Sequence, residues 1–238
     1  NTLATGANAV LSIANTKTVT LTDGTLTNAG RIDGPGTLAY VRSGSAGTPV
    51  FGAIYCPLSL SLASGATART ITPGSDTVLG STLSVSSADD DQTITFDLAG
   101  RNLQCAGITA GTRGVIKGGE GVIKNYGNLD TSAGTWTPET CQYIQAGAGT
   151  IKLAAGQSFN DLIIRSGAAG SSLLSDVTVD GIYAHVPELD KGEFTLTYDA
   201  GKEYTGKRRP LQKRIIKRIV WPSLADKELL EEIERVSA

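Results

Sequence analysis

Residues 149 to 181 read GTIKLAAGQSFNDLIIRSGAAGSSLLSDVTVDG, and this stretch decides the fold class. Within it, Ile151–Leu153 and Val177–Val179 alternate apolar with polar residues, which is the period of a strand with one buried face. Glycines stand between these segments and supply the positive φ that tight corners require. The alternating segment that starts at Ile151 has a counterpart that starts near Leu173, a spacing of about 20 residues. The stretch therefore predicts short strands that are joined by glycine corners and repeat turn after turn.

The same pattern extends outward over the first 201 residues. Further alternating segments lie at Thr18–Leu21, Thr25–Thr27, Leu58–Leu62, Leu83–Val85 and Ile94–Leu98. Turn signals separate them at Asp23–Gly24, Asn28–Gly30, Asp33–Gly36, Gly118–Gly119 and Asp180–Gly181. Apolar starts at Ile94, Val115 and Trp136 repeat the spacing of about 20 residues. No segment of this part has the periodicity of an amphipathic helix, so we predict an all-β domain over residues 1–201.

A repeat of this length favours a single-stranded right-handed parallel β-helix, in which each turn stacks on the next. Strands of three to five residues are short for a sandwich, but an antiparallel sandwich or barrel remains the alternative. Gly, Thr, Ala and Ser supply about 43% of the chain. Small side chains suit a narrow interior, and stacked hydroxyl residues suit its outer faces.

Composition excludes several classes. Charged residues make up 18% and aromatic residues 5% of the chain, with a net charge of −2, so the whole chain offers no excess charge for an acidic or basic partner. No apolar stretch reaches 18 residues, so no membrane span is expected.

Charge is nevertheless segregated in the last 37 residues. Residues 202–221 carry eight basic residues against Glu203, a net of +7, whereas residues 222–238 have a net of −3. We therefore predict a second unit, 202–238, that consists of a basic arm and a short amphipathic helix at Leu224–Val236. A helix of this length is only marginally stable alone in water, so we expect its apolar stripe to pack against another protein surface.

We expect this second unit to be the attachment and oligomerisation device. Its basic residues would meet an acidic protein surface, which we favour over nucleic acid because the following helix is acidic. The apolar stripe would lie on a neighbouring subunit or on the particle surface. The expected partner-binding residues are Arg208, Arg209, Lys213, Arg214, Lys217, Arg218, Trp221, Leu229, Leu230, Ile233 and Val236.

Candidate metal and redox residues are few. Cys56, Cys105 and Cys141 are far apart and lack neighbouring histidines, so we interpret them as small buried hydrophobic residues; a Cys105–Cys141 bridge is the alternative. Asp89, Asp90 and Asp91 offer oxygens to calcium, but consecutive aspartates are more typical of a charged loop tip. No metal and no cofactor are expected.

Candidate catalytic residues are equally sparse. Asp176 with Asp180, and Glu188 with Asp190, could share a face as the carboxylate pair that glycoside hydrolysis needs. The single histidine, His185, has no nearby nucleophile and is interpreted as a packing or capping residue. The chain contains no G-x-S-x-G, P-loop or Rossmann motif. We therefore assign no catalytic residue.

The pattern G-T-apolar-x-L … F-x-D/N-L-x-I … L-x-x-D-apolar-T-V-x-G, from Gly149 to Gly181, resembles the pectin-lyase-like right-handed β-helices of phage appendages and large secreted adhesins. The resemblance covers residues 3–198 and is carried by the composition of the turns. It implies an architecture and no activity, because no catalytic motif of the polysaccharide lyases is matched.

Two functions follow as expectations. The first is a non-enzymatic structural virion protein, a head-decoration or fibre-type appendage on the virion surface that assembles as a homotrimer and binds capsid or tail proteins through residues 202–238. The second is a carbohydrate-active or glycan-binding β-helix, either a tailspike-like lyase or hydrolase or a secreted adhesin at the cell surface, with a host-surface glycan as its ligand.

Overall fold

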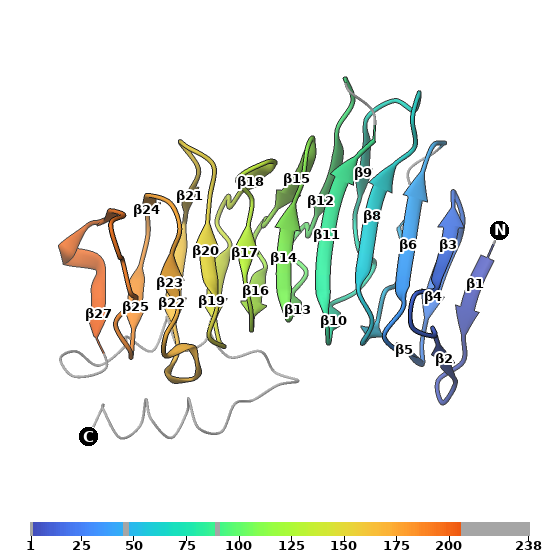
Figure 1. The fold of residues 1–238 in the computed structure, drawn as a ribbon, viewed down its shortest axis with the longest axis horizontal. Coiled ribbons are helices and arrows are strands. Elements are labelled where there is room, and N and C mark those ends of the chain that lie inside the picture. Colours follow the sequence, from blue (N-terminus) through green and yellow to red (C-terminus); the bar gives the residue numbers. More distant parts are fainter. Residues whose placement is uncertain (1, 45–47, 89–90, 206–238) are drawn as a thin grey trace.

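The computed structural model describes residues 2–44, 48–88 and 91–205, which form a parallel β-solenoid of about ten turns (Figure 1). Paired strands are parallel in each of its sheets, and a strand pairs with the strand one turn further along the chain. One turn takes between 19 residues (Thr18 to Thr37) and 26 residues (Thr77 to Leu103). The predicted all-β class and parallel solenoid are confirmed, and the antiparallel alternative is wrong for the described residues.

The turns stack into three faces. The first is a ten-stranded sheet made of β2 (Val10–Ser12), β5 (Arg31–Asp33), β7 (Ala53–Ile54), β10 (Thr77–Leu79), β13 (Leu103–Cys105), β16 (Val122–Asn125), β19 (Gln142–Gln145), β22 (Asp161–Ile164), β25 (Tyr183–His185) and β27 (Glu203–Thr205). The second is an eight-stranded sheet made of β3 (Thr18–Thr22), β6 (Thr37–Arg42), β8 (Leu58–Leu62), β11 (Thr82–Ser87), β14 (Gly107–Ala110), β17 (Leu129–Asp130), β20 (Thr150–Lys152) and β23 (Ser172–Leu173).

The third face consists of three shorter sheets, whose strands follow a strand of the eight-stranded sheet and precede one of the ten-stranded sheet in most turns. Its strands are β1 (Thr2–Thr5), β4 (Thr25–Asn28), β9 (Arg69–Ile71), β12 (Ile94–Asp97), β15 (Gly114–Lys117), β18 (Thr135–Thr137), β21 (Ser158–Phe159), β24 (Val177–Val179) and β26 (Leu196–Tyr198). Two three-residue 3₁₀ helices, Ser166–Ala168 and Ala200–Lys202, complete the regular structure of the described residues.

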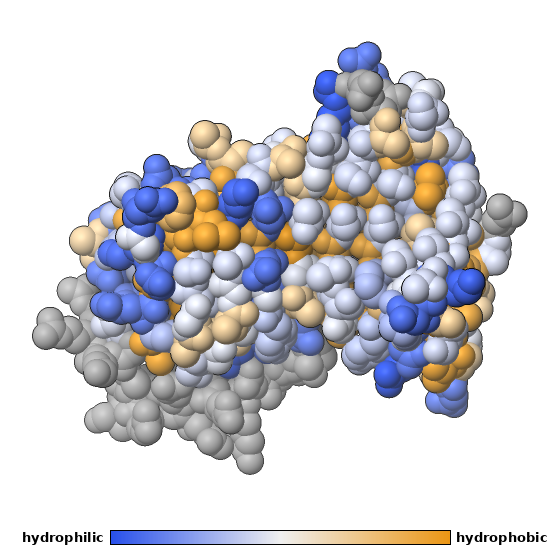
Figure 2. Space-filling model, in the orientation of Figure 1, coloured by the Kyte–Doolittle hydropathy of each residue, from blue (hydrophilic) through white to orange (hydrophobic). Residues whose placement is uncertain are grey.

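Inside the solenoid, apolar side chains stack in ladders along the axis. Every strand of the eight-stranded sheet contributes one residue to such a ladder: Val19, Leu38, Leu58, Leu83, Ile108, Leu129, Ile151 and Leu173. On the opposite side of the same strands, Ser59, Ser84 and Thr109 stack toward solvent. Figure 2 shows an apolar band along the solenoid axis between rows of paler residues. Alternation of period two thus builds both the core and the outer faces.

The short segments predicted from alternation are strands in the structure. Leu58–Leu62 and Val177–Val179 have the predicted bounds, and the others differ by one or two residues at an end. One register differs: Ile94 pairs with Gly114, and the inward ladder of the third face joins Phe96, Ile116 and Trp136. Val115 points outward on its strand, so the predicted spacing was right but the matched residues belonged to opposite faces.

Corners place backbone in the left-handed region where the sequence has turn signals. Gly34 has φ of 104° and Gly119 of 60°, both inside predicted turns. Asp23, also in a predicted turn, has φ of 49°, a conformation that aspartate tolerates better than most residues. At Gly114 the reason for glycine is close approach, because an added Cβ would collide with the carbonyl oxygen of Val85.

All three cysteines are free and buried, so the interpretation as small core residues is confirmed and the alternative, a bridge between Cys105 and Cys141, is wrong. Burial raises the pKa of the Cys105 thiol, and likewise that of Cys141, to about 12. Such thiols remain protonated and packed among apolar neighbours at neutral pH.

The solenoid reaches further than the boundary expected at residue 201. Strand β27 pairs with β25 and adds the tenth strand of the sheet, so the repeating structure includes Thr205. The predicted helix at 224–236 and all the expected partner-binding residues, from Arg208 to Val236, lie outside the described residues.

Candidate functional site

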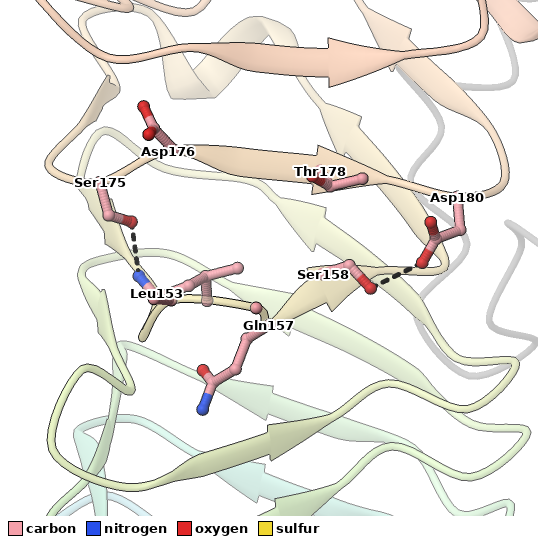
Figure 3. A pocket seen from close by; sticks show the side chains of 9 residues that line it. Leu153, Gln157, Ser158, Ser175, Asp176, Thr178 and Asp180 are labelled. Carbon is pink, nitrogen blue, oxygen red and sulfur yellow. Dashed lines mark hydrogen bonds between the residues drawn. The ribbon is translucent and has the colours of Figure 1, made fainter.

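A surface pocket of about 450 Å³ lies beside β21 and β24 near the C-terminal end of the third face (Figure 3). It is lined by Leu153, Ala155, Gly156, Gln157, Ser158, Ser175, Asp176, Thr178 and Asp180. The predicted pair Asp176 and Asp180 therefore does share one face of the solenoid, whereas Ser158 and Gln157 were not predicted.

Strand alternation places these side chains. Val177 and Val179 are buried, so Thr178 between them points outward, and Asp176 and Asp180 lie at the two ends of β24 (Figure 3). Ser158 pairs with Thr178 one turn away and lies beside it in the pocket. The pocket is therefore a direct product of the period-two pattern on two stacked strands.

The polar groups of the pocket are already hydrogen-bonded within the solenoid. The Ser158 hydroxyl donates to the Asp180 carboxylate at 2.6 Å, and the backbone N–H of Thr195 donates to Asp176 at 2.8 Å. The Ser175 hydroxyl accepts from the backbone N–H of Leu153 at 2.8 Å. Each carboxylate therefore binds a neighbouring turn of the solenoid.

The spacing of the two aspartates constrains their chemistry. They are four residues apart on an extended strand, which separates their Cα atoms by about 13 Å. In glycosidases the two carboxyl groups themselves lie about 5 to 9.5 Å apart across the scissile bond. The pocket offers hydroxyl, amide and carboxylate groups that can bind a polyol.

The other candidate carboxylates do not form a site. Glu188 and Asp190 are both exposed, and Asp190 accepts a hydrogen bond from the backbone N–H of Gly192 at 3.0 Å, which is the role of a turn residue. Asp91 is exposed, while Asp89 and Asp90 lie outside the described residues. Within 2–44, 48–88 and 91–205, no three His, Cys, Asp or Glu side chains gather as a metal ion would require.

His185 belongs to a polar cluster at the C-terminal end of the core. Its Nε2 lies 3.0 Å from a Glu203 carboxylate oxygen, and its ring stacks on Tyr183 at 4.8 Å between centroids. The Tyr198 ring also packs against Tyr183, at 4.8 Å between centroids, and burial raises the pKa of both tyrosine hydroxyls above the ordinary value. The cluster covers the last apolar layers, so the interpretation of His185 as a packing and capping residue fits its contacts.

The outer face of the ten-stranded sheet was missed from the sequence. Ile144, Ala146, Ile163 and Ala184 form a second apolar cluster there, with Val122, Ile182 and Tyr204 packed against it; we call this the outer apolar cluster. The signal lay in the runs QYIQA and DLIIR, where apolar residues follow one another without alternation. Such continuous runs are typical of strands that are buried on both faces.

The chain matches no protein-family profile, no curated protein and no solved structure. Among the described residues there is no helix long and apolar enough to cross a membrane.

Proposed function

We propose that the protein is a non-enzymatic structural component of a virion surface, a fibre or decoration protein anchored through residues 202–238. The observation that carries the proposal is the uninterrupted stacking of the ten-stranded sheet from β2 to β27. At the spacing of neighbouring strands this sheet alone is about 43 Å long. A rod with one continuous core suits a spacer that holds its two ends apart.

Charge segregation supports anchoring at one end. Residues 202–221, which include β27 and the chain that follows it, carry a net charge of +7, whereas residues 1–201 carry a net charge of −6. A basic segment of this kind associates quickly with an acidic protein surface, in a salt-sensitive way. Capsid or tail proteins with such surfaces are the proposed partners.

The open ends of the solenoid support self-assembly. The terminal strands β2 and β27 of the ten-stranded sheet each have a neighbour on one side only, among the described residues. Unpaired strand edges favour association unless another chain or segment covers them. A homotrimer would provide this cover and is the proposed form of the assembled appendage.

A glycan-binding role, at the virion or at a cell surface, is the second candidate. It is favoured by the pocket beside β24, where Ser158, Thr178 and the two aspartates present polar groups on one face. Polar groups at fixed positions give orientation and specificity to small ligands. No aromatic side chain lines this pocket as a sugar platform.

Two measurements test these roles. Immunogold electron microscopy on native particles, with an antibody raised against the solenoid, should label a regular position on the virion, and unlabelled particles would reject the structural role. A polysaccharide panel with glycan-binding and soluble-product assays tests the second candidate. Turnover that is lost in Asp176→Asn and Asp180→Asn would replace the structural proposal by an enzymatic one.

A further inference from the structure

The pocket beside β24 lies where the third face of the solenoid is interrupted. Strand β18 ends the four-stranded sheet of this face, and β21, one turn later, begins the three-stranded sheet. Side chains bridge the interruption, because the Trp136 indole donates to the Ser158 carbonyl at 2.9 Å and the Gln157 amide donates to the Gly134 carbonyl at 2.9 Å. The wall of the pocket at β21 is therefore held by directional contacts with the preceding turn.

Three polar groups of the pocket have capacity left for a ligand. Asp176 accepts the backbone N–H of Thr195 through Oδ1, and Asp180 accepts the Ser158 hydroxyl through Oδ2. The second oxygen of each carboxylate makes no hydrogen bond to the part of the chain that the structure describes, and neither does the hydroxyl of Thr178, which lies between the two aspartates along β24 (Figure 3). All three groups can accept hydrogen bonds, so the pocket suits a ligand that is rich in donors.

The charge of the pocket narrows the class of ligand. Among the described residues that line it are two aspartates and neither a lysine nor an arginine. Lys202 lies beside the pocket, but its Nζ donates to the backbone carbonyl of Asp180 at 3.0 Å rather than to a carboxylate. Carboxylates attract a cationic group and repel an anionic one. The pocket therefore disfavours sugars that carry carboxylate or sulfate groups.

We propose that this pocket binds an amino sugar with a free, protonated amine, that is, a deacetylated hexosamine unit of a surface polysaccharide. The ammonium group donates charge-assisted hydrogen bonds to the free carboxylate oxygens, and the sugar hydroxyls donate to Thr178. Leu153 and Ala155 offer apolar contact to the C–H groups of the ring. The volume of about 450 Å³ lies within the range of small-ligand sites, about 300 to 1,000 Å³.

A basic peptide is the competing ligand, and the hydroxyl groups favour the sugar over it. A lysine side chain would bind a carboxylate but has no group for the Thr178 hydroxyl, and its flexible stem loses rotamer freedom on binding. A hexosamine carries its amine and its hydroxyls on one rigid ring, so it meets both kinds of group at a smaller entropic cost. This ligand class rests on the glycan-binding candidate described above and is independent of the virion role.

An NMR titration of the full chain tests the ligand class. A short glucosamine oligomer should shift the backbone amide resonances of Ser158, Thr178 and Asp180. The matched probe is the N-acetylated oligomer of the same length, in which every ammonium group is replaced by a neutral amide. It should bind at least about fivefold more weakly, because hydrogen bonds to a charged donor are stronger than those to a neutral one. Equal affinity of the two oligomers, or no shift at these amides, would overturn the proposal.

Charge-removing variants test the two carboxylates. Asp180→Asn keeps the shape of the side chain and an acceptor for the Ser158 hydroxyl, and Asp176→Asn likewise keeps an acceptor for the N–H of Thr195. Each should weaken binding of the glucosamine oligomer by about fivefold or more. Glu120→Gln is the control, since it removes the same charge at an exposed residue that does not line the pocket, and it should leave the affinity unchanged. Unchanged affinity in both aspartate variants, or an equal loss in Glu120→Gln, would contradict the assignment.

Two further ligands separate the possible failures. Lysine oligomers of the same charge should not displace the glucosamine oligomer at comparable concentration, and if they do, the site binds a basic peptide and the proposal is wrong. Neutral oligosaccharides that bind this pocket as tightly as the glucosamine oligomer would overturn the amino-sugar assignment and keep the glycan-binding candidate. If no sugar binds the chain, both fail, and the virion role still depends on the electron microscopy alone.

Discussion

The two main interior ladders of the solenoid differ in chemistry. The ladder of the eight-stranded sheet is apolar in all its turns, from Val19 to Leu173. In the ten-stranded sheet, an apolar series through Ile32, Ile54 and Leu79 gives way to Cys105, Asn125 and Gln145. Both ladders are buried, so the second must satisfy its polar groups internally.

The polar part of the second ladder is a connected network. Asn125 donates to the Gly127 carbonyl at 2.8 Å and to the Tyr143 hydroxyl at 2.7 Å, and this hydroxyl donates to Gln145 at 2.8 Å. The Gln145 amide then donates to the carbonyls of Gly127 and Gly147 at 2.8 and 2.7 Å. The two amides therefore bind the corners of successive turns through directional hydrogen bonds. The apolar ladder of the eight-stranded sheet contributes buried apolar area, which has no directional preference. The comparison shows that an apolar ladder contributes buried area, whereas a polar ladder also specifies how the corners of successive turns stack.

The largest expected effect is at the centre of the apolar ladder. Leu83 is fully buried between Leu58 and Ile108, so Leu83→Ala leaves a cavity and should lower the free energy of unfolding by about 3 to 4 kcal/mol. Urea denaturation followed by circular dichroism measures this change. Leu83→Met, which nearly conserves volume, should cost less than about 1.5 kcal/mol. Equal losses in the two variants would contradict the ladder as a close-packed core.

A smaller loss is expected in the polar ladder. Asn125→Leu keeps the volume of the side chain but removes the donor to the Tyr143 hydroxyl and one of two donors to Gly127. Leaving buried groups with fewer partners should cost about 2 kcal/mol. The same denaturation experiment measures it, and a gain in stability would show that the network does not hold the corner.

The difference between the ladders also explains which features the sequence predicts. Leu58–Leu62 and Val177–Val179 were predicted with their observed bounds because alternation and glycine corners are local signals. The aspartates of the pocket were paired correctly for the same reason, since Asp176 and Asp180 flank one alternating strand. Asn125 was not recognised, because an asparagine before Tyr-Gly resembles a turn signal and its burial depends on residues 18 to 20 positions away. The outer apolar cluster was missed because its face is defined only when five turns are stacked.

A pH-dependent effect is expected at a corner of the eight-stranded sheet. The Ser43 hydroxyl and the backbone N–H groups of Gly44 and Ser43 donate to Asp23, and they lower the pKa of its carboxyl to about 2. Because the folded pKa lies below the unfolded value, the stabilisation is present above about pH 4 and is lost as the pH falls toward about 2.

Comparison with Asp23→Asn measures this contribution. The carboxyl is partly exposed, so we expect a difference of only about 1 kcal/mol at neutral pH, screened by solvent. The difference between the two unfolding free energies should shrink across the acidic window. A constant difference from neutral pH to pH 2 would contradict the assignment of the effect to the charged carboxyl.

The smallest effect is expected at Gln104. It gives the most direct test of whether hydrogen bonds distinguish the polar ladder from the apolar one. Like Asn125, Gln104 is an amide on a strand of the ten-stranded sheet, but it points to the outer face and its buried Oε1 has no hydrogen-bond partner among the described residues. An unpaired buried acceptor already carries its desolvation cost, so Gln104→Leu removes that cost and should change the free energy of unfolding by no more than about 0.5 kcal/mol, or raise it. Asn125→Leu makes the same exchange of amide for apolar side chain one strand away, at a site where the amide has partners. If the two substitutions destabilise equally, amide chemistry as such would matter and the hydrogen bonds of the inner network would not explain the difference between the ladders.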